Sequence, residues 1–187
     1  RHPLPGETLL GDSYAEFPGG KGLNQVVAAA RAGASTSLHS AVGDDAAGDR
    51  LRSLVLDEKV DDAYLLTSAG QPTGRAAIVV SASGENSIVV VPGANADIVA
   101  PGALPACRVL LTQLEVPRVA VQATLALARS AGTLTLLNPA PAQLLDDSLL
   151  SLCDIVIPNE HEVELLGGID ALHAAGVGIV IVTRGAD

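Results

Sequence analysis

Aromatic side chains are almost missing from this chain of 187 residues. Phe and Tyr together make up 2% of it, Trp and Met do not occur, and yet 48% of the residues are hydrophobic. A buried core must therefore be aliphatic, built from Ala, Val, Leu and Ile. The chain is long enough to bury such a core, and its composition excludes a disordered protein. We expect one folded domain.

Basic residues are also scarce, with 11 Lys and Arg against 21 Asp and Glu, which gives a net charge of -10. Nucleic acids and anionic lipid surfaces both bind proteins through clustered Lys and Arg, so neither is an expected partner. No apolar run reaches the ~18 residues that span a bilayer. The start, Arg1-His2-Pro3, is not a secretory signal.

Only two cysteines occur, Cys107 and Cys153, which is too few for a disulfide framework and favours a reducing, cytoplasmic setting. Each precedes a predicted strand among apolar neighbours, so both are expected to be buried structural thiols. Metal-ligand spacing is absent from the four histidines, which are His2, His39, His161 and His173. No Ser/His/Asp nucleophile arrangement stands out either.

The first half of the chain mixes helix and strand patterns. A helix should follow the glycines at 19–22 and stop at Gly33, and Asp44 should cap a second helix. Arg75–Ser81 and Ser87–Val91 are typical of a hairpin, because Gly84 and Asn86 tolerate the turn between them. The other predicted strands are Ser37–Val42 and a short one at Thr8–Tyr14.

From Arg108 onward, aliphatic strands alternate with helices, which predicts a parallel sheet buried on both faces. The predicted strands are Val109–Leu114, Thr133–Leu137, Asp154–Ile157 and Ile179–Val182. The predicted helices are Val119–Ser130, Pro141–Leu152 and His161–Leu166.

Ligands of open α/β sheets gather beyond the carboxyl ends of the strands. The polar or acidic residues expected there are Gln113, Glu115, Asn138, Asn159, Glu160, Glu162, Thr183 and Arg184. Any one of them could be an ordinary solvated loop residue. The whole set favours a binding site.

The glycine-rich stretch fails two standard tests for nucleotide binding. A P-loop would need Gly where Ala15 stands and Ser or Thr where Gly22 stands, and a dinucleotide fingerprint would need Gly or Ala where Gln25 stands. A flexible helix start remains, with Lys21 and Asn24 nearby. It suits a hydroxyl-rich ligand or an anion, although a tight loop before a helix explains it equally well.

Taken together, several motifs resemble the ribokinase family of carbohydrate kinases. They are Gly19–Gln25, Gly43-Asp44-Asp45, Gly84-Glu85-Asn86, Gly93-Ala94-Asn95, Gln113-Leu114-Glu115, Asn138–Ala142 and Pro158-Asn159-Glu160. The resemblance covers nearly the whole chain. It implies a ribokinase-like three-layer α/β/α fold with a mainly parallel central sheet and a small β-sheet lid, whose strands would lie near residues 6–16 and 73–92.

The resemblance also implies a reaction, the ATP-dependent phosphorylation of D-ribose to ribose 5-phosphate. The implied sugar ligands are Gly20, Lys21, Gly22, Asn24 and Glu115. The implied ATP-binding residues are Asn159, Thr183, Arg184 and Gly185. Glu162 would organise Mg²⁺ through water. The family further implies a monovalent cation (K⁺) and a homodimer formed through the lid.

The chain departs from the family pattern in ways that leave alternatives open. The usual first strand has no counterpart before Arg1, and the segment between Glu164 and Ala171 is short. We therefore expect one α/β domain over 1–187 that is incomplete at both ends. No catalytic residue is assigned within it, since the catalytic Asp would lie beyond Asp187. Another sugar or nucleoside kinase of the same family and a non-catalytic sugar-binding module are the alternatives.

Overall fold

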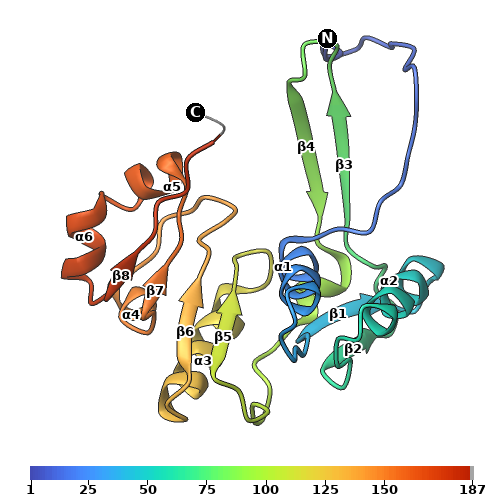
Figure 1. Ribbon diagram of the computed structural model, residues 1–187. Helices are drawn as coiled ribbons and strands as arrows, with labels where there is room; N and C mark the ends of the chain where they lie inside the picture. Colours follow the sequence, from blue (N-terminus) through green and yellow to red (C-terminus); the bar gives the residue numbers. More distant parts are fainter. Residues whose placement is uncertain (186–187) are drawn as a thin grey trace. The chain divides into compact units, whose positions relative to one another are not determined.

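Residues 1–185 are described by the computed structural model, and the chain divides after Asn95 into two units. Figure 1 shows both, coloured along the sequence. The single α/β domain expected over 1–187 stays a prediction. Among the described residues, no helix is both long enough and apolar enough to cross a bilayer.

The first unit contains two helices and two small sheets. Its elements are α1 (Lys21–Arg31), β1 (Ser40–Gly43), α2 (Ala46–Asp57), β2 (Leu65–Ser68), β3 (Arg75–Val80), β4 (Asn86–Val91) and the start of the 3₁₀ helix η1 (Gly93–Asp97). β1 and β2 pair in parallel, and β3 and β4 pair antiparallel as the predicted hairpin.

Both helices of the first unit pack into one aliphatic cluster. Leu23 of α1, Val55 of α2, and Val42 and Leu65 of the small parallel sheet are buried together in it. α1 ends before Gly33, as predicted. The cap of α2 differs from the prediction: Asp45, not Asp44, accepts a hydrogen bond from the helix and begins it.

The β3–β4 hairpin projects from the rest of its unit (Figure 1). Every residue of both strands is exposed. The strand predicted at Thr8–Tyr14 is wrong, because residues 1–20 contain no strand. A strand needs a partner for its backbone N–H and C=O groups, and the structure pairs β3 and β4 only with each other. Strands are present within 73–92 but not within 6–16, and the lid role of these segments stays a prediction.

The second unit alternates strand and helix, as predicted. Its elements are β5 (Val109–Thr112), α3 (Arg118–Ser130), β6 (Leu134–Leu137), α4 (Asp147–Leu150), β7 (Ile155–Val156), α5 (Glu160–Leu165), α6 (Ile169–Ala174) and β8 (Ile179–Val180). The four strands form one parallel sheet in the order β5-β6-β7-β8.

The helices of this unit pack on one face of the sheet, so the prediction that both faces are buried stays a prediction. All four helices contribute to one cluster on one face, where Leu125, Leu137 and Val156 are fully buried. The opposite face exposes aliphatic side chains, among them Val109, Leu111, Leu134 and Ile179. The strands are apolar on both sides, but the helices of this unit cover only one.

Three further predictions need correction. The helix expected over Pro141–Leu152 is only the short α4, because Asp146 accepts from the Leu149 N–H (3.0 Å) and begins the helix there. β2 and α6 are additions that the sequence pattern does not predict. Of the two thiols, Cys153 is buried as expected, whereas Cys107 is only partly buried.

Candidate functional site

The first group of predicted site residues lies in the first turn of α1. Gly20 occupies the N-cap position with φ of 105°, a left-handed conformation that favours glycine, and it has no side chain to cap the helix. Asn24 N–H donates to the Gly20 carbonyl (3.0 Å) and makes the first bond of the helical ladder. Leu23 of this turn is buried in the core, and Lys21, Gly22 and Asn24 belong to the same turn.

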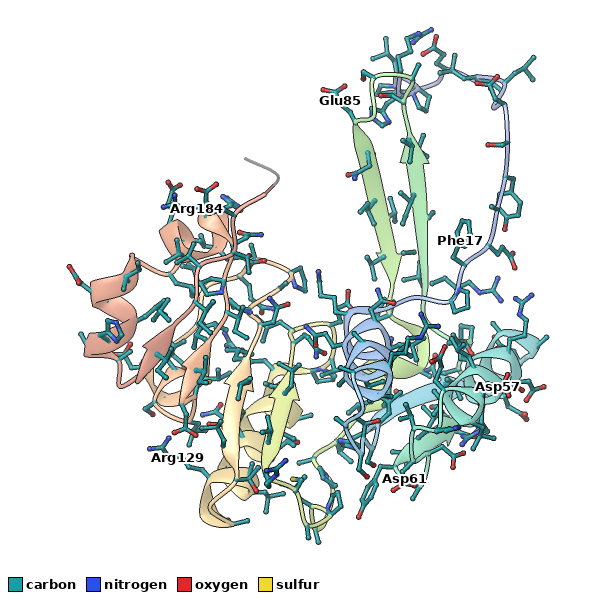
Figure 2. The ribbon with its side chains drawn as sticks, in the orientation of Figure 1. Phe17, Asp57, Asp61, Glu85, Arg129 and Arg184 are labelled. Carbon is teal, nitrogen blue, oxygen red and sulfur yellow. The ribbon has the colours of Figure 1, made fainter. Side chains whose placement is uncertain are left out.

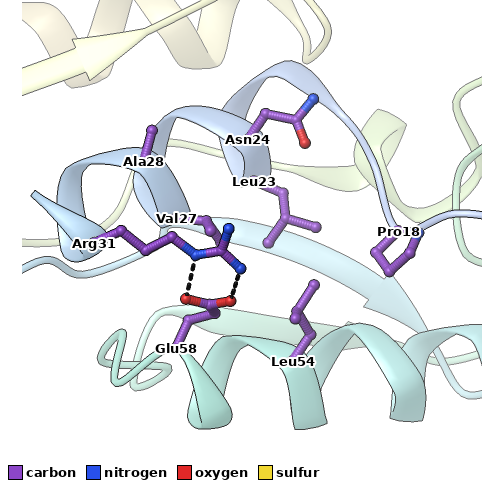
Figure 3. Close-up of a pocket in the computed structure, with 8 residues that line it drawn as sticks. All are labelled: Pro18, Leu23, Asn24, Val27, Ala28, Arg31, Leu54 and Glu58. Atoms are coloured by element: carbon purple, nitrogen blue, oxygen red, sulfur yellow. Dashed lines mark hydrogen bonds and ion pairs between the residues drawn. The ribbon is translucent and has the colours of Figure 1, made fainter.

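A surface hollow of about 480 Å³ lies beside this turn, between α1 and α2 (Figure 3). Asn24 stands at the hollow, but most of the lining is apolar, from Pro18, Leu23, Val27, Ala28 and Leu54. The charged lining residues Arg31 and Glu58 are hydrogen-bonded to each other, with Arg31 Nε donating to Glu58 Oε2 (2.8 Å). A sugar needs hydrogen-bonding partners around its ring, and this hollow offers few.

The second group lies at the carboxyl edge of the four-stranded sheet. Asn138, directly after β6, donates from Nδ2 to the Ile157 carbonyl after β7 (2.8 Å). Its own N–H donates to the carbonyl of Thr112, the last residue of β5 (2.9 Å). Asn138 therefore joins three strand ends, which is a structural role that explains a polar residue there.

Asn159 and Glu162 form a capping box at the start of α5. Asn159 Oδ1 accepts from the Glu162 N–H (2.8 Å), and Glu162 Oε2 accepts from the Asn159 N–H (2.9 Å). The Glu162 side chain is buried, with 5% of the residue exposed. Helix capping alone thus accounts for the Asn-x-x-Glu spacing, and it fixes both side chains at the edge of the sheet.

The residues after β8 complete this group. Asn159 and Thr183 form a parallel bridge, in which Thr183 N–H donates to the Pro158 carbonyl (2.8 Å). Arg184, labelled in Figure 2, lies 3.9 Å from a carboxylate oxygen of Glu160, and both side chains are largely exposed. Gly185 is exposed, and a Cβ built there meets nothing within 4 Å. Asn159, Glu162, Thr183 and Arg184 are therefore brought together.

Glu115 lies three residues after β5 and is half-buried. It belongs to the second unit, as do Asn159, Glu162, Thr183, Arg184 and Gly185, whereas the Gly20–Asn24 turn belongs to the first. The predicted site residues thus form two sets, one in each unit.

The metal-binding capacity of these residues is small. Among residues 1–185, no group of three or more His, Cys, Asp or Glu side chains could hold a metal ion. Glu162 offers one carboxylate, with Oε2 already accepting from the backbone. One carboxylate fits Mg²⁺ that arrives with nucleotide phosphates and keeps most of its waters. The described residues offer no cage for a resident ion.

Sequence reasoning misses the function of Asp45 at the base of the hairpin. Its carboxylate accepts from Thr73 Oγ1 (2.6 Å), from Gly48 N–H (2.8 Å) and from Thr73 N–H (3.0 Å). These bonds, led by the Thr73 hydroxyl, lower the pKa of Asp45 to about 2. The Gly43-Asp44-Asp45 motif is the available signal, but on its own it indicates only helix capping.

Comparison with known proteins gives consistent results. The family model of the pfkB carbohydrate kinases matches residues 1–187. A ribokinase of Haemophilus influenzae is 39% identical over 200 residues, covering 97% of this chain and 65% of the relative. A ribokinase of Staphylococcus aureus is 40% identical over 176 residues, covering 90% of this chain and 58% of the relative. The chain thus spans less than two thirds of either relative.

Solved structures agree with this result. The structure of Arabidopsis thaliana ribokinase complexed with ribose and ATP matches with a TM-score of 0.81 at 26% identity, covering 97% of this chain and 65% of that one. The predicted ribokinase-like α/β fold is confirmed. On the match over its whole length, the chain belongs to the pfkB family of carbohydrate kinases.

Proposed function

We propose that the protein containing this chain is a ribokinase, which transfers the γ-phosphoryl group of ATP to the primary hydroxyl of D-ribose. The observation that carries the proposal is the 39% identity to a ribokinase across 97% of the chain. A solved relative with this fold is a complex with ribose and ATP, the two substrates of that reaction.

The sugar is assigned to the first turn of α1 and to Glu115. Ribose is a neutral polyol, so hydrogen bonds supply its specific recognition. Gly20 and Gly22 let the backbone approach the sugar closely, while Lys21 and Asn24 offer side-chain donors, and Asn24 also an acceptor. Glu115 accepts from hydroxyl groups. This set contains donors and acceptors, as a sugar requires.

The nucleotide is assigned to the carboxyl edge of the second unit. Asn159 is held there by its own helix cap, and Thr183, Arg184 and Gly185 follow the neighbouring strand. Arg184 carries a positive charge toward the phosphates. Glu162 would hold water molecules around Mg²⁺, and the ion when bound neutralises phosphate charge during transfer. A K⁺ requirement is part of the proposal on family resemblance alone.

No described residue is assigned as the catalytic base. Glu115 is the candidate carboxylate on the sugar side, and its proposed role is to bind the sugar. The catalytic Asp that the resemblance places after Asp187 stays a prediction. The lid is the β3–β4 hairpin, which covers the sugar in this proposal. A second copy of the protein is its proposed partner, paired through the lid.

The test is ADP release by the complete gene product, measured with ribose, fructose, a nucleoside or no acceptor. We expect ribose-dependent release that Glu115→Ala or Asn24→Ala reduces about tenfold or more, because each substitution removes a proposed hydrogen-bond partner of the bound sugar. Asp57→Ala, which removes an exposed carboxylate at the end of α2, is the matched control and should leave the kinetics unchanged.

Other outcomes separate the alternatives. Faster turnover of fructose or a nucleoside than of ribose would assign a different substrate on the same scaffold. Ribose binding without ADP release by the complete protein would identify a sugar-binding module. Unchanged ribose kinetics in a folded Glu115→Ala protein would remove Glu115 from the site.

A further inference from the structure

The base of the β3–β4 hairpin is fixed by a dense set of contacts. The Asp45 carboxylate joins the first turn of α2 to Thr73, through one bond from Gly48 N–H and two from Thr73. Thr73 Oγ1 in turn accepts from the Gly43 N–H at the end of β1 (2.9 Å). Thr73 itself is 3% exposed. One carboxylate thus ties together a strand end, a helix start and the residue that leads into the hairpin.

Backbone packing holds the same segment in place. A Cβ at Gly43 would lie 2.3 Å from the Gln71 carbonyl oxygen and 2.5 Å from the Thr73 nitrogen, distances at which only glycine fits. On the return side of the hairpin, Ala94 N–H donates to the Pro72 carbonyl (2.9 Å). Residues 71–73 are therefore fixed from both sides.

The constraint ends immediately above this point. β3 begins at Arg75, and every residue from there to the end of the strand is exposed, as in β4. The two strands pair with each other, and the anchoring bonds from Asp45 lie at the base of the hairpin. Its direction therefore depends on how residues 71–73 are attached.

The base of the hairpin is connected through α2 to the first turn of α1, which is the proposed sugar-binding turn. Asp45 caps α2, and Val55 of α2 packs in the same buried cluster as Leu23 of α1, which lies between Gly22 and Asn24. The hairpin and the α1 turn are thus joined through one packed core within the first unit.

We propose that Asp45 is a positioning residue for the hairpin: its bonds to Thr73 set the direction in which the hairpin closes over the sugar. This proposal rests on the proposed function, in which the hairpin is the lid. Asp45 is assigned no contact with a substrate and is not a catalytic residue. A loosely attached lid spends less time in the direction that covers the sugar, so the apparent affinity for ribose should fall.

The test uses three substitutions in the complete gene product. Asp45→Asn keeps an oxygen that can cap α2 but replaces the acceptor of the Thr73 N–H by an amide donor. Thr73→Val removes the hydroxyl at nearly constant volume, and Thr73→Ser restores it. The matched control is Asp146→Asn, since Asp146 also caps a helix and has a pKa lowered by hydrogen bonds, but lies in the second unit.

Two measurements are made on each protein: hydrogen exchange of the peptide covering residues 73–81 without ligand, and the KM values for ribose and ATP. Asp45→Asn and Thr73→Val should each speed the exchange and raise the ribose KM about tenfold, the effect of losing a charged hydrogen bond, while the ATP KM stays within about twofold. Thr73→Ser and Asp146→Asn should match the unmodified protein in both.

The outcomes separate this inference from the proposed function. If hydrogen exchange at residues 73–81 is unchanged in both Asp45→Asn and Thr73→Val, the bonds between Asp45 and Thr73 do not hold the hairpin. Faster exchange with an unchanged ribose KM overturns the positioning role. Equal rises in the KM for ribose and ATP also overturn it, because a general loss of stability would do the same. Absence of ribose phosphorylation by the unmodified protein rejects the proposed function. The exchange experiment still tests whether Asp45 holds the base of the hairpin.

Discussion

The two thiols differ in their surroundings, and their reactivity should differ accordingly. Cys153 is fully buried and its Sγ donates to the Leu149 carbonyl (3.6 Å), and burial raises the pKa of this thiol to about 12. Because the thiolate is the reactive form, Cys153 should resist alkylation in the folded protein. Cys107 is partly accessible and should be alkylated first.

Peptide mass spectrometry after iodoacetamide treatment measures this difference, with and without guanidinium. Cys107→Ser is the control, and it should abolish the early labelling of the peptide that contains residue 107. Labelling of Cys153 in the native protein at the rate seen in guanidinium would contradict the burial described here.

Asp45 should also make the free energy of unfolding depend on pH. Its pKa falls from 3.8 to about 2, first because the Thr73 hydroxyl and then because the N–H groups of Gly48 and Thr73 donate to it. The Arg75 guanidinium, 3.9 Å away, adds to this effect. The unfolded chain therefore binds a proton more readily than the folded one. The stabilisation is complete above pH 3.8 and is lost as the pH falls toward 2.

Urea unfolding at several pH values between about 5 and about 2.5 tests this prediction. The free energy of unfolding of the Asp45→Asn protein should fall less steeply over that range than that of the unmodified protein. Asp57→Asn, which changes an exposed carboxylate on the same helix, is the control. Identical slopes for Asp45→Asn and the unmodified protein would show that Asp45 is not held as described.

Residue roles that depend on distant backbone are the ones that the sequence could not reveal. Asp44 and Asp45 are equally good caps on paper, and only the extended backbone of Asp45, with φ of -144° and ψ of 166°, selects it. Gly43 must be glycine because residues 71–73 pass beside it. The capping role of Asn159 and Glu162, by contrast, follows from a spacing of three residues.

At the scale of an element, two substitutions of Asn159 distinguish its role as the cap of α5 from its proposed role in binding ATP. Asn159→Ala should lower the free energy of unfolding by about 1 kcal/mol, the usual cost of losing an N-cap. Asn159→Asp keeps the cap and should leave stability unchanged. It also places a negative charge at the proposed phosphate site, so the KM for ATP should rise.

Urea unfolding and ATP kinetics on the two variants distinguish these effects. Unchanged ATP kinetics in the Asn159→Asp protein would show that Asn159 does not contact the nucleotide and only caps α5. Ser148→Ala is the control, because the Ser148 hydroxyl donates to the carboxylate of Asp146, which caps α4 rather than α5. It should leave the ATP kinetics unchanged.

Strong local patterns predict elements well, and weak ones fail. The hairpin is predicted within a residue at each strand because its aliphatic runs and its glycine turn agree. β2 has four residues, of which only Leu65 is buried, so it has no alternating pattern to detect. The apolar pattern of residues 141–152 fits a long helix, but the helix begins only after the Asp146 cap.

For the whole molecule, the exposed hairpin predicts a dimer. Cross-strand pairing puts Ile78 and Ile88 on one face and Ala77 and Val89 on the other, and both faces are open. In the proposed function one face of the hairpin covers the sugar, and a second protomer would cover the other, since exposed apolar patches of this kind mark interaction sites. Sedimentation of the complete protein at micromolar concentration should show a dimer.

Ile88→Lys and Val89→Lys form a matched pair for this test, because they place the same charge on opposite faces of one strand. Burying an unpaired charge is costly, so only one of the two should dissociate the dimer. The other should instead impair ribose kinetics. A clean monomer of the unmodified protein, with or without ribose, would contradict pairing through the lid.

The family could be identified from sequence because its motifs are spread over nearly the whole chain. The division after Asn95 could not, since no linker composition marks it. Nor could the face of the four-stranded sheet on which the helices of the second unit pack. Val109 and Leu111 are as apolar as Leu110 between them, so the pattern does not say which side the helices cover.

The same hairpin has a consequence for the life of the protein in the cell. β4 reads Asn-Ser-Ile-Val-Val-Val, an uncharged hexamer rich in β-branched residues and without proline or glycine, which is the composition of segments that stack into fibrils. Within residues 1–185, each strand of the hairpin has one edge without a partner strand. Charged residues of the kind that oppose such stacking lie at opposite ends of the hairpin, with Glu85 directly before β4 and Arg75 at the start of β3. Newly made chain therefore exposes an aggregation-prone segment for as long as nothing covers the hairpin.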